Sequence, residues 1–528
     1  MRGNCFGKHK ENIEKSLFRC RPDGSAGDTG CIDRILYFTL MDQNLDCDNG
    51  KLFTHIMHMW TEKTFLLKDW YYSTTLEWDC SALFAVFFYG LTGNIYVACS
   101  LSNAILLLIF LAAVFYLFRG KNILYPLLCA NLLCIPYRIG MLDYFNMLFF
   151  AGTQYIVKIT IPLLLIGILL SLEQEDKSKR DKAVDGIYIA LYFFYLFVSS
   201  SSSGIYVTAC GLMPVVLAYV ARKFFRWEKA SVKSCLILVL TFVCALIGMM
   251  INRKIMGGTR SDSMVLASIW QMHNNVVGCF NGIFELMGAL LKEEGILVFS
   301  LHGISVLLKV CLTIAAIGCG ILSIVFLVKK DDLRRLLLVS VPVWNYFILN
   351  VAYVRAGSET YEYRYHLIGM IPLMCVMVYT VLEFFFRCRK EQQWVLYALG
   401  VCVVLAVSGS SFKEMLTRGE QNADLKELCA YFENTDVEVV YLFDASNDSD
   451  MAKVIDQSRP YICCFEDGRT YAYDYYLSYK DAPMRMDGDV IVAVAEDTYD
   501  FGDSFEIAGH RLVKYDSVGY RSLYYFAD

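Results

Sequence analysis

The chain has 528 residues, of which 56% are hydrophobic and 19% charged, and its net charge is −5 at pH 7. This balance excludes a disordered protein and is unusual for a soluble one. The slightly negative charge also argues against a nucleic-acid partner, because such proteins concentrate positive charge.

Residues 1–45 form a polar, poorly defined amino-terminal segment, and residues 46–94 read as a first external loop that includes an interfacial helix. The loop is rich in aromatic and acidic residues, which suit a sugar because rings stack on its CH faces and carboxylates accept from its hydroxyls. Trp and Tyr are equally typical of a membrane interface, and single acids often belong to a solvated surface. The residues concerned are Asp46, Asp48, Glu62, Asp69, Glu77 and Asp79, with Trp60, Trp70, Tyr71, Tyr72 and Trp78.

His55 and His58 are spaced to share one helix face, but a third metal ligand is missing from the pattern, so we expect no metal ion.

Residues 95–409 are dominated by long apolar runs separated by short basic stretches. The first run, Ile95–Phe118, carries no charge and exceeds the roughly 20 residues that cross a bilayer core. Backbone polar groups in lipid must be paired inside helices, so the pattern predicts a polytopic α-helical membrane protein with about 10–11 spans. The spans we predict are 95–118, 123–137, 154–171, 186–201, 204–221, 231–251, 305–328, 336–354, 367–386 and 394–409, with a tight polar turn at Ser199–Ser203.

The loops alternate in charge, which fixes the expected orientation. One set contains most of the basic residues, and the positive-inside rule places it in the cytoplasm. The loop 252–304, whose apolar residues recur at helical spacing, is then external and lies along the membrane surface. Ten crossings put both termini outside, so either Cys80–Gly93 crosses or the natural chain has an earlier helix. We favour the earlier helix, because Cys80–Gly93 is short and typical of a re-entrant or interfacial segment.

Residues 410–528 change character and predict a small extracytoplasmic α/β domain. A short amphipathic helix, Asp424–Phe432, is followed by strand-like runs at Val437–Phe443, Tyr461–Phe465, Val490–Val494, Arg511–Tyr515 and Ser522–Phe526.

Several basic residues fall at the predicted outer ends of the membrane helices. Charges at membrane depth are costly unless they are paired or near water, and a ring of cations on one face suits the phosphates of a lipid carrier. For Lys158 and Lys309 we favour the alternative that they extend to the interface. The candidate substrate-binding residues are Arg138, Lys309, Arg355, Arg364 and His366, together with the aromatic Trp70 and Tyr72.

The layout resembles the GT-C superfamily of membrane glycosyltransferases. The resemblance rests on the acidic segment KDWYYSTTLEWD, the short run CSALFAVFFYGLTG that ends in glycine, and the long helix NIYVACSLSNAILL that follows it directly. It implies a sugar donor linked to polyprenyl phosphate, used at the outer membrane face without a cofactor. By resemblance, Asp46, Asp48, Glu77 or Asp79 is the base that activates the acceptor, and Arg364 and Lys309 hold the donor phosphate.

We therefore expect a glycosyltransferase in a bacterial plasma membrane. Its partners would be membrane lipids, a polyprenyl-phosphate-linked sugar, and a glycan, lipid or protein acceptor of the cell envelope. A transporter or flippase for a lipid-linked or small anionic substrate is the main alternative, but it should show midplane charges and broken helices in related halves. A third alternative is a noncatalytic scaffold whose carboxyl-terminal domain binds an envelope partner.

Overall fold

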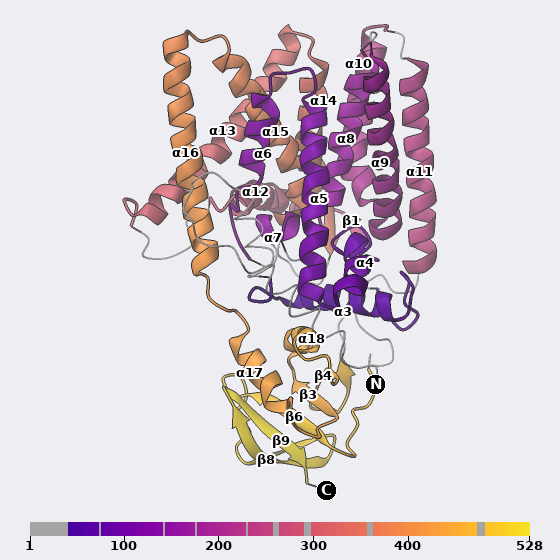
Figure 1. Cartoon of the computed structure of the whole chain (residues 1–528), viewed down its shortest axis with the longest axis vertical. Helices are drawn as coiled ribbons and strands as arrows, with labels where there is room; N and C mark the ends of the chain where they lie inside the picture. Colours follow the sequence, from indigo (N-terminus) through magenta and orange to yellow (C-terminus); the bar gives the residue numbers. More distant parts are fainter. Residues whose placement is uncertain are drawn as a thin grey trace, which may run out of the picture.

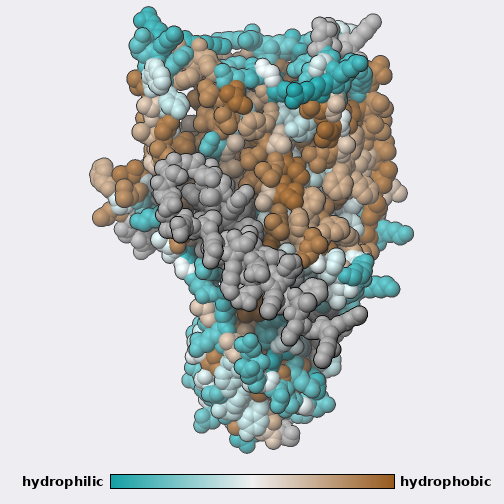
Figure 2. Space-filling view, viewed as in Figure 1, coloured by the Kyte–Doolittle hydropathy of each residue, from teal (hydrophilic) through white to brown (hydrophobic). Residues whose placement is uncertain are grey.

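The computed structural model describes residues 41–72, 75–140, 143–150, 152–174, 177–228, 231–256, 263–289, 297–355, 363–471 and 481–527. Figure 1 shows a bundle of long helices with a small sheet domain beneath one of its ends. Figure 2 shows a broad hydrophobic area on the visible face of the bundle, with hydrophilic residues at the end of the bundle away from the sheet domain and over the sheet domain itself. This is the surface expected of a protein whose helices are surrounded by lipid.

Every predicted span coincides with a helix in the described part of the chain. Among the residues described, seven helical segments are long and apolar enough to cross a membrane: α5 (Ile95–Leu117), α9 (Lys179–Ser203), η1 with α10 (Thr208–Leu212, Met213–Phe225), α11 (Val232–Met256), α13 (Leu301–Lys329), η2 with α15 (Tyr363–His366, Leu367–Phe385) and α16 (Lys390–Thr417). Three further predicted spans correspond to α6 (Leu124–Leu133), α8 (Ile156–Leu172) and α14 (Leu333–Val351). The predicted polytopic helical architecture is confirmed.

Two local predictions were wrong. The helix expected over 123–137 is only Leu124–Leu133, because Pro136 lacks an N–H and disfavours helical geometry in the residue before it. The serine run Ser199–Ser203 is the last turn of α9 and not a loop, and the chain turns at Gly204 with φ 66°. Serine hydroxyls usually compete with helix hydrogen bonds, but here Ser199 and Ser203 donate instead to the carboxylate of Asp79.

Short elements cover the end of the bundle that faces the sheet domain (Figure 1). The region Cys80–Gly93 contains a short helix, as expected, and the 252–304 loop contains the amphipathic α12. An antiparallel ribbon, β1–β2, was not predicted. These elements are α3 (Cys47–Thr61), α4 (Ala82–Thr92), α7 (Tyr144–Leu148), α12 (Ile269–Leu286), β1 (Ser263–Leu266) and β2 (Ala352–Arg355).

The carboxyl-terminal domain is a seven-stranded mixed sheet in the order β5-β4-β3-β6-β9-β8-β7, with β3 parallel to both β4 and β6. Helices α17 and α18 pack on one face of the sheet. The predicted helix and five predicted strands are all present, whereas α18, β5 and β7 were missed because their sequences are polar or short. The elements are α17 (Ala423–Phe432), α18 (Ser446–Ile455), β3 (Val439–Phe443), β4 (Tyr461–Cys464), β5 (Thr470–Tyr471), β6 (Val490–Ala495), β7 (Ser504–Ile507), β8 (His510–Val518) and β9 (Arg521–Phe526).

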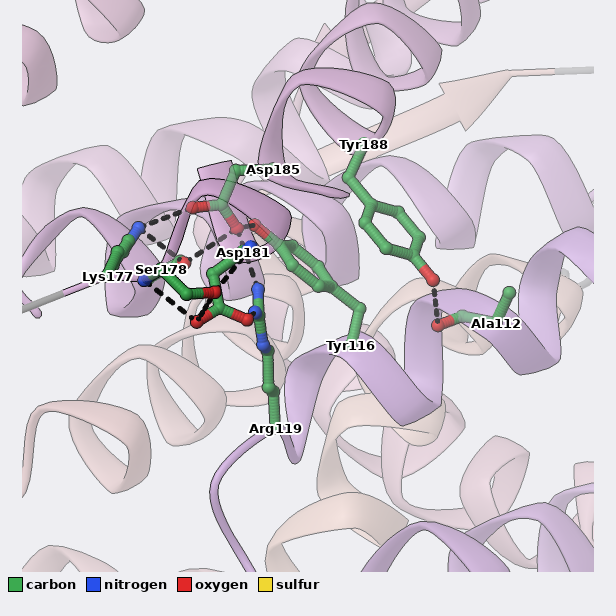
Figure 3. Close-up of polar contacts among 9 residues, drawn as sticks. Ala112, Tyr116, Arg119, Lys177, Ser178, Asp181, Asp185 and Tyr188 are labelled. Carbon is green, nitrogen blue, oxygen red and sulfur yellow. Dashed lines mark hydrogen bonds and ion pairs between the residues drawn. The ribbon is translucent and has the colours of Figure 1, made fainter. Parts of the chain in front are cut away.

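The opposite end of the bundle is held by ion pairs between helix ends (Figure 3). Asp185 of α9 accepts from the Tyr116 hydroxyl at 2.9 Å and from Arg119 at 3.0 Å, and it also pairs with Lys177. Arg119 additionally pairs with Asp181. Most of the basic loops lie at this end, so the charged residues that suggest the orientation also tie α5 to α9.

Candidate active site

The amino terminus of α3 brings the most distinctive set of polar groups together. Asp46 caps the helix, and its carboxylate accepts from the backbone N–H of Asn49 at 2.9 Å and from the side-chain amide of Asn49 at 2.6 Å. The amide of Asn146, from α7, donates to the same carboxylate at 3.0 Å. Aspartate is among the preferred N-cap residues because it satisfies helix N–H groups that have no partner within the helix. The sequence therefore fixes the direction of this side chain locally.

The environment of Asp46 changes its acidity. Burial raises the pKa of its carboxyl, the nearby charge of Asp48 raises it further, and the donors from Asn49 and Asn146 only partly oppose this, so that the pKa is about 7. A general base is most effective when its pKa lies near the working pH. Asp46 is thus suited to accept a proton at neutral pH.

A cation from a distant part of the sequence lies beside Asp48. Arg364, in η2, places a guanidinium nitrogen 4.0 Å from a carboxylate oxygen of Asp48. The same guanidinium lies 5.6 Å from the centre of the Tyr365 ring. The fold therefore brings one of the predicted acids, Asp48, to one of the predicted phosphate ligands.

Glu77 lies in a separate cluster, between α3 and α4 in the chain. Its carboxylate pairs with Lys51 at 2.7 Å and with Nδ1 of His55 at 3.0 Å. Burial raises the pKa of Glu77, but the charges and hydrogen bonds of Lys51 and His55 outweigh burial and lower it to about 2. A carboxylate with so low a pKa is a weak base. Lys51 and His55 also hold the Glu77 side chain in place.

The predicted sugar-stacking residues belong to this cluster and are buried. Trp70 is 2% exposed and stacks on His55, with ring centres 4.4 Å apart. Tyr72 is 6% exposed, its hydroxyl lies 3.4 Å from Nε2 of His55, and it accepts from the N–H of Leu67. Their placement favours a packing role over contact with a sugar.

Asp79 is also enclosed by its own partners. It is 1% exposed, pairs with Lys158 of α8 at 3.1 Å, and accepts from Ser199 at 2.7 Å and Ser203 at 2.9 Å. The prediction that Lys158 extends to the membrane interface is therefore wrong. Its side chain is buried and neutralises the carboxylate of Asp79. This arrangement joins the loop before α4 to α8 and α9.

Arg138 and Lys309 each have partners of their own. Arg138 pairs with Asp143 at 3.3 Å and with Glu285 of α12, and the hydroxyl of Tyr363 donates to Asp143 at 2.6 Å. Lys309 is 3% exposed and donates to the backbone carbonyl of Tyr137 at 2.6 Å. For Arg355 the structure describes the backbone, paired with Ser263, and the position of its side chain lies outside the description.

An apolar cavity of about 370 Å³ opens beside η2. It lies among α12, α13, α14 and α15, and His366 lines it at the end of η2. Lining residues Phe280, Ile321 and Val343 are each about half exposed on the outside of the bundle, at 51%, 59% and 51%. These half-exposed apolar side chains place the cavity at the outer surface of the bundle.

Comparison with known proteins identifies the architecture. Neither a family model nor a curated protein matches the chain. Among solved structures, ArnT from Cupriavidus metallidurans, in its apo state and bound to undecaprenyl phosphate, matches with a TM-score of 0.54 at 10% identity. The match covers 94% of this chain and 96% of ArnT. The chain has the GT-C fold.

A second GT-C structure is more distant. The archaeal oligosaccharyltransferase AglB from Archaeoglobus fulgidus, in complex with an inhibitory peptide and a dolichol-phosphate, matches with a TM-score of 0.41 at 11% identity, over 81% of this chain and 63% of AglB.

Sequence reasoning missed the two asparagines that orient Asp46. The spacing Asp46-x-x-Asn49 follows the pattern of a helix amino terminus, in which the cap and the third helical residue bond to each other. The contact between Asn49 and Asp46 could therefore have been predicted from the sequence. Asn146 stands as a single polar residue in an apolar stretch. Its role depends on the GT-C fold bringing α7 against α3, which no local pattern indicates.

Proposed function

We propose that this protein is a membrane glycosyltransferase that moves a sugar from a polyprenyl-phosphate carrier to an acceptor of the cell envelope. The observation that carries the proposal is the approach of Arg364 to Asp48, which acts on the helix cap Asp46, beside an apolar cavity at the surface of the bundle. A base and a phosphate ligand next to a site for a hydrocarbon chain are the parts that such a reaction requires.

Asp46 is the proposed base. It accepts the proton of the acceptor hydroxyl as the hydroxyl oxygen attacks the anomeric carbon. The bond between that carbon and the phosphate oxygen breaks, and the lipid phosphate leaves with the bonding electrons. Asp48 raises the pKa of Asp46 and lies 4.0 Å from Arg364, so it acts on both the base and the cation. The reaction balances with the lipid-linked sugar and the acceptor as its substrates, and it requires no cofactor.

Arg364 is the proposed ligand of the departing phosphate. A guanidinium presents several N–H donors in a planar fork that matches phosphate oxygens. Preorganised donors of this kind stabilise the negative charge that develops in the transition state. Arg138 and Lys309 are proposed as a second group of cations near the same headgroup.

The cavity beside η2 is the proposed site of the lipid chain. Apolar residues dominate its lining, with Asn345, Tyr346 and His366 as the polar exceptions. Burying a hydrocarbon chain against such a surface is favourable, at about 25 cal/mol per Å² of apolar area. A hydrated small anion would lose its water there without gaining partners, and this argues against transport of such an ion.

We further propose that the carboxyl-terminal domain and α3 lie outside the cytoplasm. The basic loops at the opposite end of the bundle support this orientation.

A transfer assay tests the proposal. The full-length protein in lipid nanodiscs would be given undecaprenyl phosphate linked to radiolabelled glucose, mannose or arabinose, with cell-envelope extract as the source of acceptor. We expect release of undecaprenyl phosphate that depends on the protein and on the acceptor. Protein-dependent movement of the intact lipid-linked sugar across a vesicle membrane, without cleavage, would instead support the flippase alternative.

A further inference from the structure

The carboxyl-terminal domain contacts the short segment that carries the proposed base. The backbone N–H of Gln421 donates to the carbonyl of Gln43 at 3.1 Å. The side-chain amide of Asn422 donates to the carbonyl of Leu45 at 2.6 Å, and Asn422 is only 6% exposed. Leu45 directly precedes Asp46. Two hydrogen bonds from the start of the domain therefore fix the backbone just before the helix cap.

Asn422 makes this contact in place of a more usual one. It occupies the N-cap position of α17, yet its side chain makes no capping hydrogen bond. Asparagine is among the best N-cap residues because its side chain normally satisfies the first helix N–H groups. The side-chain amide of Asn422 instead bonds to the segment before α3, so it links the carboxyl-terminal domain to that segment.

Helix α18 supports α3 from the same side (Figure 1). A Cβ atom added to Gly50, in the first turn of α3, would lie 2.6 Å from the carbonyl oxygen of Asp450 in α18. The two backbones are therefore in direct contact. Val454 of α18 is 2% exposed and belongs to the main hydrophobic core, together with residues of the helix bundle. The domain is thus packed against α3 as well as tied to it.

We propose that Asn422 is a positioning residue, through which the carboxyl-terminal domain holds the amino terminus of α3, and with it Asp46, in the geometry needed for transfer. The effect of Asn422 on transfer rests on the proposed function. Asn422 contacts neither the base nor any reacting atom in this arrangement. It acts through the carbonyl of Leu45, and a misplacement of about 1 Å at a reacting group can lower a rate by about 100-fold.

The test replaces Asn422 by serine in the full-length protein in nanodiscs. Serine caps helices as asparagine does but is too short to reach Leu45. We expect faster amide hydrogen exchange in peptides covering residues 42–50. With the undecaprenyl-phosphate-linked glucose, mannose and arabinose panel, we expect kcat to fall about 10- to 100-fold and KM for the donor to stay within about twofold.

A second variant and a control keep the test decisive. Asn422→Asp preserves size and capping ability but removes the donor, so it should give the same loss. Tyr431→Phe removes the exposed hydrogen bond to Asp516 within the same domain and should change neither exchange nor kcat.

Unchanged amide exchange at residues 42–50 in both Asn422 variants would show that Asn422 does not hold this segment. Faster exchange with an unchanged kcat would show that holding the segment does not position Asp46 for transfer. Failure of the proposed function is separately visible, because the wild-type protein would then release no undecaprenyl phosphate from the donor panel, while exchange would still report on the contact of Asn422.

Discussion

At the scale of single residues, four acids with the same predicted role receive four different environments. Glu77 and Asp79 are each enclosed by a lysine and other donors. Asp46 instead has a raised pKa and faces neutral amides, and Asp48 lies beside Arg364. The chemistry of a carboxyl group depends on its neighbours more than on its identity, which is why Asp46 is our choice of base.

Replacing Asp46 by asparagine should abolish transfer without disturbing the fold. Asparagine caps helices as well as aspartate, so α3 should persist, whereas the loss of a general base typically costs about 10²- to 10⁴-fold in rate. Transfer of label from the donor panel measures the loss, and native mass spectrometry should show binding of undecaprenyl phosphate within about twofold of the wild type. Glu62→Gln, at the exposed opposite end of α3, is the matched control. Full activity in Asp46→Asn would exclude Asp46 as the base.

The pH dependence of transfer should report the same residue. The base must be ionised to accept a proton, so kcat/KM should rise with pH and level off above about 7, the raised pKa of Asp46. In Asp48→Asn the like charge that helps to raise this pKa is removed, and the midpoint should move to lower pH. Rate profiles between pH 5 and 9 measure both midpoints. An unmoved midpoint in Asp48→Asn would contradict the assignment.

At the scale of elements, the buried ion pair between Asp79 and Lys158 joins the loop before α4 to α8 and, through the serines, to α9. Lys158→Met should leave Asp79 as an uncompensated buried charge and destabilise the protein by about 3–5 kcal/mol. Thermal unfolding in detergent would measure the effect as a lower Tm. The double variant Asp79→Asn/Lys158→Met removes both charges and should recover most of the loss. Equal Tm values for the single and double variants would show that the charges are not coupled.

At the scale of the whole molecule, the cavity is formed by α12, α13, α14 and α15, four helices that follow one another along the chain. Val343→Trp should fill part of it and weaken binding of undecaprenyl phosphate about tenfold, since a side chain then occupies the proposed path of the lipid. Titration followed by native mass spectrometry measures the affinity. Val239→Trp, at a comparably exposed valine of α11 (59% against 51%), is the matched control. Equal weakening by both variants would mean that the cavity is not the lipid site.

The orientation of the whole chain gives a further prediction. Alkaline phosphatase fused after the carboxyl terminus should be active in bacterial cells, because that enzyme folds only where disulfides form and the proposed orientation places the domain outside the cytoplasm. A fusion in the segment between α10 and α11, which follows Arg222 and Lys223 in the last turn of α10, should be inactive. The reverse pattern would invert the topology and place the proposed site in the cytoplasm.

The sequence by itself determined the class of the protein and the positions of its spans. The length of an uninterrupted apolar run is a local property, and it decides whether a helix can cross the hydrocarbon core of a bilayer. It also determined most strands of the carboxyl-terminal domain and the acidic character of the first loop. The tertiary structure alone decided which acid faces Arg364, since 316 positions separate Asp48 from that cation. It likewise decided that Trp70 stacks on His55 and that Asn422 bonds to Leu45. Such contacts depend on how helices pack, and packing between distant segments leaves no periodic signal in the chain.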